Sequence, residues 1–260
     1  MTRKAAAVLI ALVFSIGLGG SFARAQALSG EEVAQRVHDR PVGKDSVAQM
    51  EMILESKSGH RRVRTFRAIT RTDGPLRKAL IRFLSPADIE GTGFLVLEKE
   101  GAETEQFLFL PALRRARRIV SSQKGRSFVN SDFTYEDMER RPVEDFDHKL
   151  VGEEVLEQVP CWVVDSTPRP GTRSQYGRLR TWVAKDMDVP LRIHYFDKKD
   201  RHIKTYQVQA LQQIEGIWTE MVVVMHNLKD DHRTILRTLG VDYDTGLDDS
   251  AFTVRALETW

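Results

Sequence analysis

Residues 107–138 decide the fold prediction and read FLFLPALRRARRIVSSQKGRSFVNSDFTYEDM. The apolar run at 107–110 has the length of a strand that is buried on both faces, and Pro111 ends it. A cationic loop follows, with four arginines in five positions: Arg114, Arg115, Arg117 and Arg118. The stretch closes on an acidic and aromatic segment, residues 131–138. A buried strand, a positive loop and an acidic segment therefore lie close together in the chain.

Apolar and polar residues alternate from Val47 onward, with Met50, Met52 and Leu54 on one side of the predicted strand. A period of two is typical of a strand with one apolar face. Short, turn-rich gaps separate similar segments, which favours antiparallel pairing of about ten to twelve strands. The segments after the first are residues 61–71, 78–84, 94–98, 107–110, 149–154, 161–167, 177–184, 189–196, 201–211, 217–227 and 234–242.

One helix is predicted in the first half of the chain. Ser29 and Glu32 form a capping box that opens it, and the helix should run to about Asp39, before Pro41 and Gly43. No break in composition follows, so residues 26–260 should form a single domain. The periodicity fits a sandwich, a closed barrel or an open curved sheet equally well.

The N-terminus has the pattern of a cleaved secretory signal. Arg3 and Lys4 precede a mostly apolar stretch, residues 5–18, and Ala23-Arg24-Ala25 provides a small-x-small cleavage site. We therefore expect residues 1–25 to be a signal peptide that is removed.

The mature chain carries a nearly balanced charge. Removing three basic residues of the signal leaves 36 basic against 37 acidic side chains, a formal net charge of −1. This balance argues against a nucleic-acid partner. Cys161 is the only cysteine, which excludes an internal disulfide, and its apolar strand pattern predicts that it is buried.

Two motifs carry a family resemblance: Leu-Pro-Ala-Leu-Arg-Arg at 110–115 and Ser-Asp-Phe-Thr-Tyr-Glu-Asp at 131–137. Together they resemble the outer-membrane lipoprotein-sorting proteins of the bacterial envelope, relatives of the LolA-like periplasmic lipoprotein carriers. Further matching segments follow at 160–163, 181–183, 190–192, 232–234 and 250–253. The resemblance implies a mainly β protein with a few helices (α+β), in which a large curved antiparallel sheet forms an unclosed half-barrel whose concave face is capped by short helices. One departure is that Val129 and Asn130 precede Ser131, where the family pattern has a glycine.

Candidate catalytic residues form no coherent set. Asp132, Glu136 and Asp137 could act as paired carboxylates, but no partner motif accompanies them, so we interpret them as an acidic loop that pairs with the neighbouring arginines. His194 and His202 flank a hairpin, and we interpret them as exposed strand residues. No phosphate loop or nucleophile elbow is present in the sequence. The sequence therefore predicts no enzymatic activity, no metal site and no cofactor.

The apolar strand faces supply the candidate lipid-binding residues. A concave lining of Met and Phe side chains would suit acyl chains, and the alternative is an ordinary packed core. The candidates for this lining are Met50, Met52, Phe66, Ile81, Phe83, Phe94, Val96, Phe107 and Phe109. The arginines at 114, 115, 117 and 118 are the candidates for contact with a lipid headgroup or a partner, and the alternative is a solvated face.

These observations together predict a monomeric periplasmic carrier. It would bind the acyl chains of lipoproteins or other envelope lipids in the hollow of the half-barrel. The resemblance implies outer-membrane sorting, or work beside an efflux-type lipid transporter of the inner membrane. The alternative function is a non-carrier module of an envelope complex that docks through its arginine-rich loop.

Overall fold

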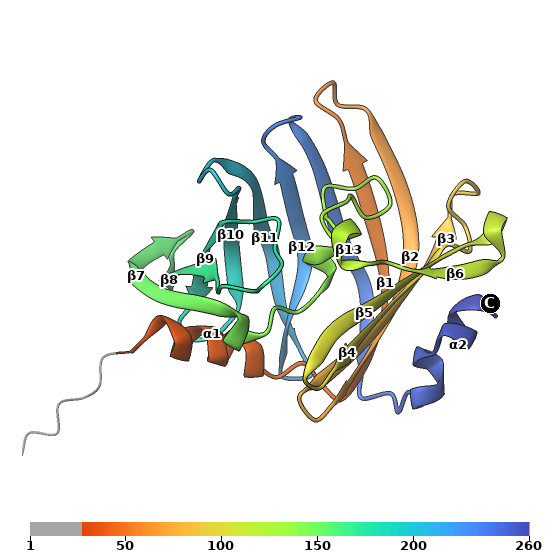
Figure 1. Ribbon diagram of the computed structural model, residues 1–260, viewed down its shortest axis with the longest axis horizontal. Helices are drawn as coiled ribbons and strands as arrows, with labels where there is room; N and C mark the ends of the chain where they lie inside the picture. Colours follow the sequence, from red (N-terminus) through yellow and green to blue (C-terminus); the bar gives the residue numbers. More distant parts are fainter. Residues whose placement is uncertain (1–27, 260) are drawn as a thin grey trace, which may run out of the picture.

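A computed structural model describes residues 28–259 of the chain, and Figure 1 shows its curved sheet. The predicted signal peptide lies outside the described residues. Thirteen strands form one antiparallel sheet in the order β6-β5-β4-β3-β2-β1-β13-β12-β11-β10-β9-β8-β7, which does not close into a barrel. The prediction of a large, unclosed antiparallel sheet is therefore confirmed. No helix within residues 28–259 is long and apolar enough to cross a membrane.

Most strands follow the alternation seen in the sequence. The first six are β1 (Asp45–Glu55), β2 (Arg61–Asp73), β3 (Leu76–Ser85), β4 (Gly93–Lys99), β5 (Ala102–Leu110) and β6 (Arg115–Arg118). The other seven are β7 (Phe146–Leu156), β8 (Val159–Pro168), β9 (Arg178–Ala184), β10 (Pro190–Phe196), β11 (His202–Ile214), β12 (Ile217–Asn227) and β13 (His232–Tyr243). The arginine run was predicted as a loop, but residues 115–118 form strand β6, because the backbone of β5 offers them an open edge.

Two α-helices lie against the sheet at different ends (Figure 1). Helix α1 (Gly30–Asp39) begins with the predicted capping box, in which Glu32 N donates to Ser29 Oγ at 3.1 Å and Ser29 N donates to Glu32 at 2.6 Å. It packs on β7 and β8 through Val33 and Val37. Helix α2 (Val254–Glu258) packs on β4, β5 and β6.

The two faces of the sheet can be followed through the strand register. The inner face carries Phe94, which pairs with Leu108 on β5, and Ile81, which pairs with Phe94. The outer face there carries Leu95 and Phe107, which pair with each other beneath α2. Helix α1 therefore lies on the concave face, as predicted for the short helices, whereas α2 covers the opposite face.

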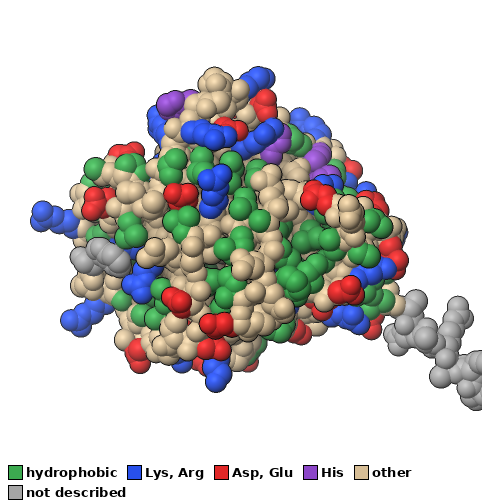
Figure 2. Space-filling view, turned by 180° about the vertical axis from the view of Figure 1, so that it is seen from behind, with side chains coloured by type: hydrophobic (Ala, Val, Ile, Leu, Met, Phe, Trp, Pro, Cys, Tyr) green, Lys and Arg blue, Asp and Glu red, His purple; other side chains and the backbone are tan. Residues whose placement is uncertain are grey.

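The connection between β6 and β7 has to cross the whole sheet. These strands follow each other in the chain, yet they lie at opposite edges of the sheet. Residues 119–145, here called the crossing segment, therefore run over the inner face and bond to several strands on the way (Figure 1). Seen from behind, hydrophobic side chains gather in the middle of the molecule and charged ones border them (Figure 2).

Candidate functional site

The crossing segment fills the inner face beside β1 to β5. Phe128 is fully buried, and its ring centroid lies 4.8 Å from that of Phe94 and 6.2 Å from that of Phe83. Tyr135 stacks 5.7 Å from Phe94, and its carbonyl accepts a 2.7 Å hydrogen bond from Gln106 on β5. This half of the hollow is therefore packed with the protein's own aromatic side chains.

Seven of the nine predicted lining residues lie in the core cluster of this inner face: Met50, Met52, Phe66, Ile81, Phe83, Phe94 and Val96. The other two, Phe107 and Phe109, were predicted for the same lining, but they lie in a second cluster with Leu257 of α2. The physical reason is the two-residue period of a strand, which turns Leu108 to the inner face and its neighbours to the outer one. The strand at 107–110 contacts apolar clusters on both faces, but only Phe109 is buried, and Phe107, Leu108 and Leu110 are half-buried, so the predicted burial on both faces is only partly met.

The acidic residues of the crossing segment bind it to other parts of the protein. The Asp137 side chain is 2% exposed and forms ion pairs with Lys204 of β11 and, at 3.3 Å, with Arg141. It also accepts a 3.0 Å hydrogen bond from the hydroxyl of Tyr176. Burial alone would raise the pKa of Asp137, but the Lys204 ammonium and the Arg141 guanidinium outweigh burial and hold that pKa below its usual value.

Two further acids hold the segment to distant strands. Asp132 accepts a 2.7 Å bond from Thr234 on β13 and lies 2.7 Å from the His232 ring. Glu136 accepts hydrogen bonds from Ser174 and from the backbone of Gln175. The prediction that these acids neutralise the neighbouring arginine run is therefore wrong, because their partners come from other parts of the sheet.

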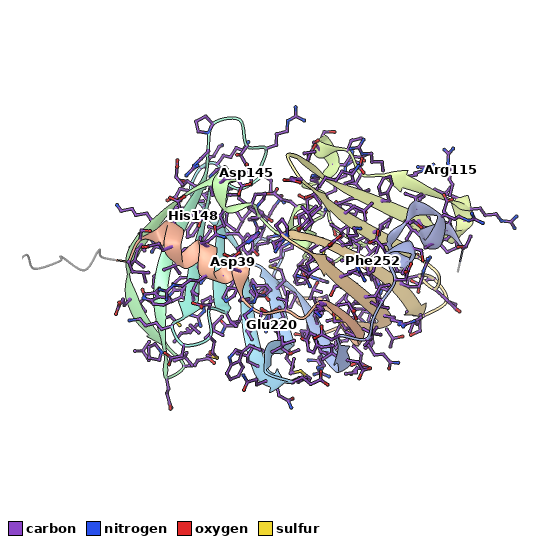
Figure 3. The ribbon with its side chains drawn as sticks, turned by 90° about the horizontal axis from the view of Figure 1, so that it is seen from below. Asp39, Arg115, Asp145, His148, Glu220 and Phe252 are labelled. Atoms are coloured by element: carbon purple, nitrogen blue, oxygen red, sulfur yellow. The ribbon has the colours of Figure 1, made fainter. Side chains whose placement is uncertain are left out.

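The arginines at 114, 115, 117 and 118 are all exposed on and beside edge strand β6. Arg118 pairs with Glu105 at 3.1 Å. Figure 3 shows Arg115 at the opposite end of the molecule from His148 and α1. Their role in headgroup or partner contact stays a prediction.

An apolar pocket lies between α1, the end of the crossing segment, and strands β8 to β10. Its volume is about 230 Å³. The apolar part of its lining is formed by Val33, Ala34, Val37, Val143, Phe146, Val164, Leu179, Val183, Pro190 and Ile193. The sequence analysis did not find this pocket, since its walls come from five separate segments. The apolar face of α1 was the signal available for it.

His148 in the wall of this pocket has a hydrogen-bond partner for each of its two ring nitrogens. His148 Nδ1 lies 2.8 Å from Ser166 Oγ, and its Nε2 lies 3.1 Å from the carbonyl oxygen of Val143. Burial lowers the pKa of His148, so the ring is neutral at neutral pH. Figure 3, seen from below, shows His148 and Asp39 beside α1 at this end of the sheet. The pocket therefore combines an apolar wall with an uncharged imidazole.

The histidines at the β10–β11 hairpin do meet. The rings of His194 and His202 stack with centroids 4.2 Å apart, and both residues are half-buried, so the predicted exposure is wrong. Burial lowers the pKa of His194 to about 4. No group of three His, Cys, Asp or Glu side chains that could hold a metal ion occurs within the described residues.

Comparison with known proteins agrees with the geometry. A family model of uncharacterized proteins matches residues 76–259. A DUF1329 family protein from Desulfovibrio piger is 32% identical with a TM-score of 0.84, over 88% of this chain and 97% of that one. A domain named for outer membrane lipoprotein sorting, from Vibrio parahaemolyticus, is 30% identical with a TM-score of 0.83, over 88% and 98%.

The same fold occurs in a more distant protein. A LolA superfamily protein from Nitrosomonas europaea is 15% identical with a TM-score of 0.69, over 87% of this chain and 98% of that one. No curated protein matches the sequence significantly. The family-model match over residues 76–259 and the 32% identity to the Desulfovibrio piger protein show that this protein belongs to the DUF1329 family.

Proposed function

We propose that this protein is a carrier that binds an acyl chain of a lipoprotein or another envelope lipid in the pocket beside α1. The observation that carries the proposal is that pocket, an apolar hollow open to solvent in a sheet of LolA-like fold. Burying a methylene group in such an environment contributes about 0.8 kcal/mol, so even part of a chain would bind measurably. The relative named for lipoprotein sorting supports the same class of ligand.

The proposal extends to the compartment and to the partners. The secretory pattern of residues 1–25 supports a periplasmic carrier that works toward the outer membrane or beside an inner-membrane lipid exporter. Carrying a lipid needs no chemical step, which agrees with the prediction of a non-enzymatic protein. The seven predicted lining residues of the inner face would then support the packed half of the hollow, next to the open half that takes the chain.

The test is a substitution in the wall of the pocket that reduces the volume available to a ligand. Ala34 lies on α1 and lines the pocket, so Ala34→Leu adds three carbons to the space that a chain would occupy. Losing room for two methylenes costs about 1.6 kcal/mol, and we expect the affinity for a fluorescent fatty acid to fall about tenfold or more. Gln35→Leu, an exposed neighbour on the same helix, is the matched control and should leave binding unchanged.

Native mass spectrometry of the protein purified from periplasm completes the test. A co-purified species of lipid mass in the wild type, lost in the Ala34→Leu variant, would support the carrier. Binding of the fatty acid with equal affinity to wild type and Ala34→Leu would refute the proposed pocket, provided that circular dichroism shows both proteins folded.

A second function is favoured by a different observation. The arginines of β6 are exposed and would be available as a docking surface that the pocket does not need. The pocket volume of 230 Å³ is below the roughly 300–1,000 Å³ common for ligand pockets. Under this alternative the protein is a non-carrier module of an envelope complex. A wild-type protein that is isolated without lipid and refuses added fatty acid would support this function.

A further inference from the structure

Three arginines lie in the wall of the apolar pocket beside α1. Arg40 follows the last turn of α1, and Arg140 and Arg141 lie at the end of the crossing segment; all three line the pocket. Arg77 of β3 lies next to them, since its backbone N–H and the Arg140 side chain share the carboxylate of Glu98. We call Arg40, Arg77 and Arg140 the arginine mouth.

The carboxylates near these arginines already have other partners. Glu98 accepts two hydrogen bonds from Arg140, at 3.1 and 2.6 Å, and is thereby engaged. The other carboxylate close to Arg77 is Glu220, which accepts a 2.7 Å hydrogen bond from Tyr206.

Asp39, the last residue of α1, is a third carboxylate near the arginine mouth. It accepts a 2.8 Å hydrogen bond from Gln35 and lies 3.0 Å from the His38 ring. Its hydrogen bond with His38, and more weakly the Arg140 guanidinium, lower its pKa. Three guanidiniums therefore face three carboxylates, each of which is already hydrogen-bonded.

Two of these arginines keep most of their donors free. Arg40 donates one hydrogen bond, to the carbonyl of Val37 at 3.0 Å. The Arg77 side chain makes no hydrogen bond or ion pair with any other residue of the described chain, and it is half-buried. Burial and the nearby guanidiniums of Arg40 and Arg140 lower the pKa of Arg77, although it stays charged at neutral pH. An exposed arginine is solvated by water and needs no protein partner. A half-buried arginine beside other arginines is stabilised by an anion that binds next to it.

Glu139, which also lines the pocket, does not supply that anion. Its carboxylate lies 2.7 Å from the Lys124 ammonium, on the side of the segment that faces the β4–β5 hairpin. Arg141 is engaged as well, by Asp137. The N–H donors left for an anion are thus those of Arg40 and Arg77.

We propose that the arginine mouth binds the anionic headgroup, a carboxylate or a phosphate, of an amphiphile whose apolar chain occupies the pocket beside α1. The proposal rests on the carrier function and specifies its ligand. Guanidinium groups bind carboxylate and phosphate oxygens through paired N–H donors, and they do so more strongly where water is partly excluded. An apolar pocket with such a mouth selects against neutral lipids.

The experiment compares two probes that differ only at the head. A fatty acid and the fatty alcohol of the same chain length are titrated into the wild-type full mature chain by calorimetry. We expect the acid to bind about tenfold or more tightly than the alcohol, since charge-assisted hydrogen bonds are the stronger ones. In Arg40→Gln/Arg77→Gln the acid should lose about that factor, while the affinity for the alcohol should stay the same.

A matched control removes the same charge elsewhere. Arg233→Gln/Arg237→Gln changes two exposed arginines of β13 and should leave both affinities as in the wild type. Equal affinities of acid and alcohol for the wild type would overturn the headgroup site and leave the carrier function standing. So would an equal loss for both probes in Arg40→Gln/Arg77→Gln.

Two further results would also overturn the proposal. If inorganic phosphate displaced the fatty acid at concentrations near the affinity of the acid itself, the mouth would be a free-anion site unrelated to a chain. If Arg115→Gln/Arg117→Gln reproduced the loss instead, the headgroup would bind at β6. Failure of both probes to bind the wild type would remove the carrier function, a result distinct from all of these.

Discussion

Asp137→Asn tests whether the ion pairs of Asp137 hold the crossing segment on the inner face of the sheet. The carboxylate of Asp137 lies between Lys204, whose side chain is 7% exposed, and Arg141. The same carboxylate accepts hydrogen bonds from Thr134, at 2.8 Å from its backbone and 2.7 Å from its hydroxyl. An asparagine keeps the shape of the side chain but removes the charge, so the buried Lys204 and the half-buried Arg141 lose their counter-ion.

The magnitude follows from that burial. Removing one partner of a buried ion pair costs about 3 to 5 kcal/mol, because the remaining charge stays desolvated. A domain is stable by only about 5 to 15 kcal/mol, so this variant should lie near its limit of stability. For a chain of this size we expect the unfolding midpoint to fall by about 6 to 20 °C.

The pH dependence has a definite sign. The folded-state pKa of Asp137 lies below its unfolded value of about 3.9, so its charge stabilises the folded protein at all pH values above that. The stabilisation is lost as the pH falls from about 4 through the folded pKa. The difference in free energy of unfolding between wild type and Asp137→Asn should therefore be constant at neutral pH and shrink in acid.

Urea denaturation followed by tryptophan fluorescence measures these values. Asp186→Asn, the same substitution in an exposed turn, is the control and should change stability by less than about 0.5 kcal/mol. Adding Lys204→Met to Asp137→Asn should recover part of the lost stability, because the buried ammonium that no longer has a counter-ion is removed. A loss below about 1 kcal/mol for Asp137→Asn, or a further loss on adding Lys204→Met, would refute the reasoning.

Two more predictions concern α1 and the thiol. A Cβ atom on Gly30 would lie 2.5 Å from the backbone N of Leu150, so Gly30→Ala should push α1 off β7 and cost about 1 to 3 kcal/mol in thermal unfolding. Gly152→Ala, where a Cβ meets nothing, is its control, and equal melting of the two variants would contradict the close approach. Cys161 is fully buried and burial raises its pKa, so thiol reagents should label it only on unfolding; labelling of the native protein at the rate of a free peptide would contradict this.

Local signals in the sequence predicted the elements that depend on local physics. The capping box at Ser29 and Glu32 fixed the start of α1, and alternation fixed most strands, because both are read within a few residues. Strand β6 was not predicted, because its residues are mostly exposed arginines and do not alternate between apolar and polar. The family resemblance chose the open sheet among the architectures that alternation left possible, and the structural neighbours confirm that choice.

The destination of the crossing segment could not be predicted, since its partners are remote in the chain. Asp137 bonds to Lys204, and Asp132 to Thr234, residues that no local pattern connects with them. The backbone of the crossing segment is strained at Val129 and Asn130. Their φ angles are 45° and 60°, a left-handed conformation that suits the glycine of the family pattern and is strained for a β-branched residue. Arg64 donates a 2.5 Å hydrogen bond to the Val129 carbonyl, which helps to hold this turn on the sheet.

The order of strands explains why a ligand would bind beside α1. Strands β6 and β7 lie at opposite edges, so the connection between them must lie on the inner face. The aromatic residues of this connection cover the inner face of β1 to β5. After Asp137 the segment turns toward β7 and leaves the strands β8 to β10 to be covered by α1. Substitutions of Phe83 or Phe94 would therefore act on folding, whereas Ala34 borders space that is open in the folded protein. Under the proposed function the packed half of the hollow serves stability and the open half binds the ligand, so substitutions in the two halves should have separable effects.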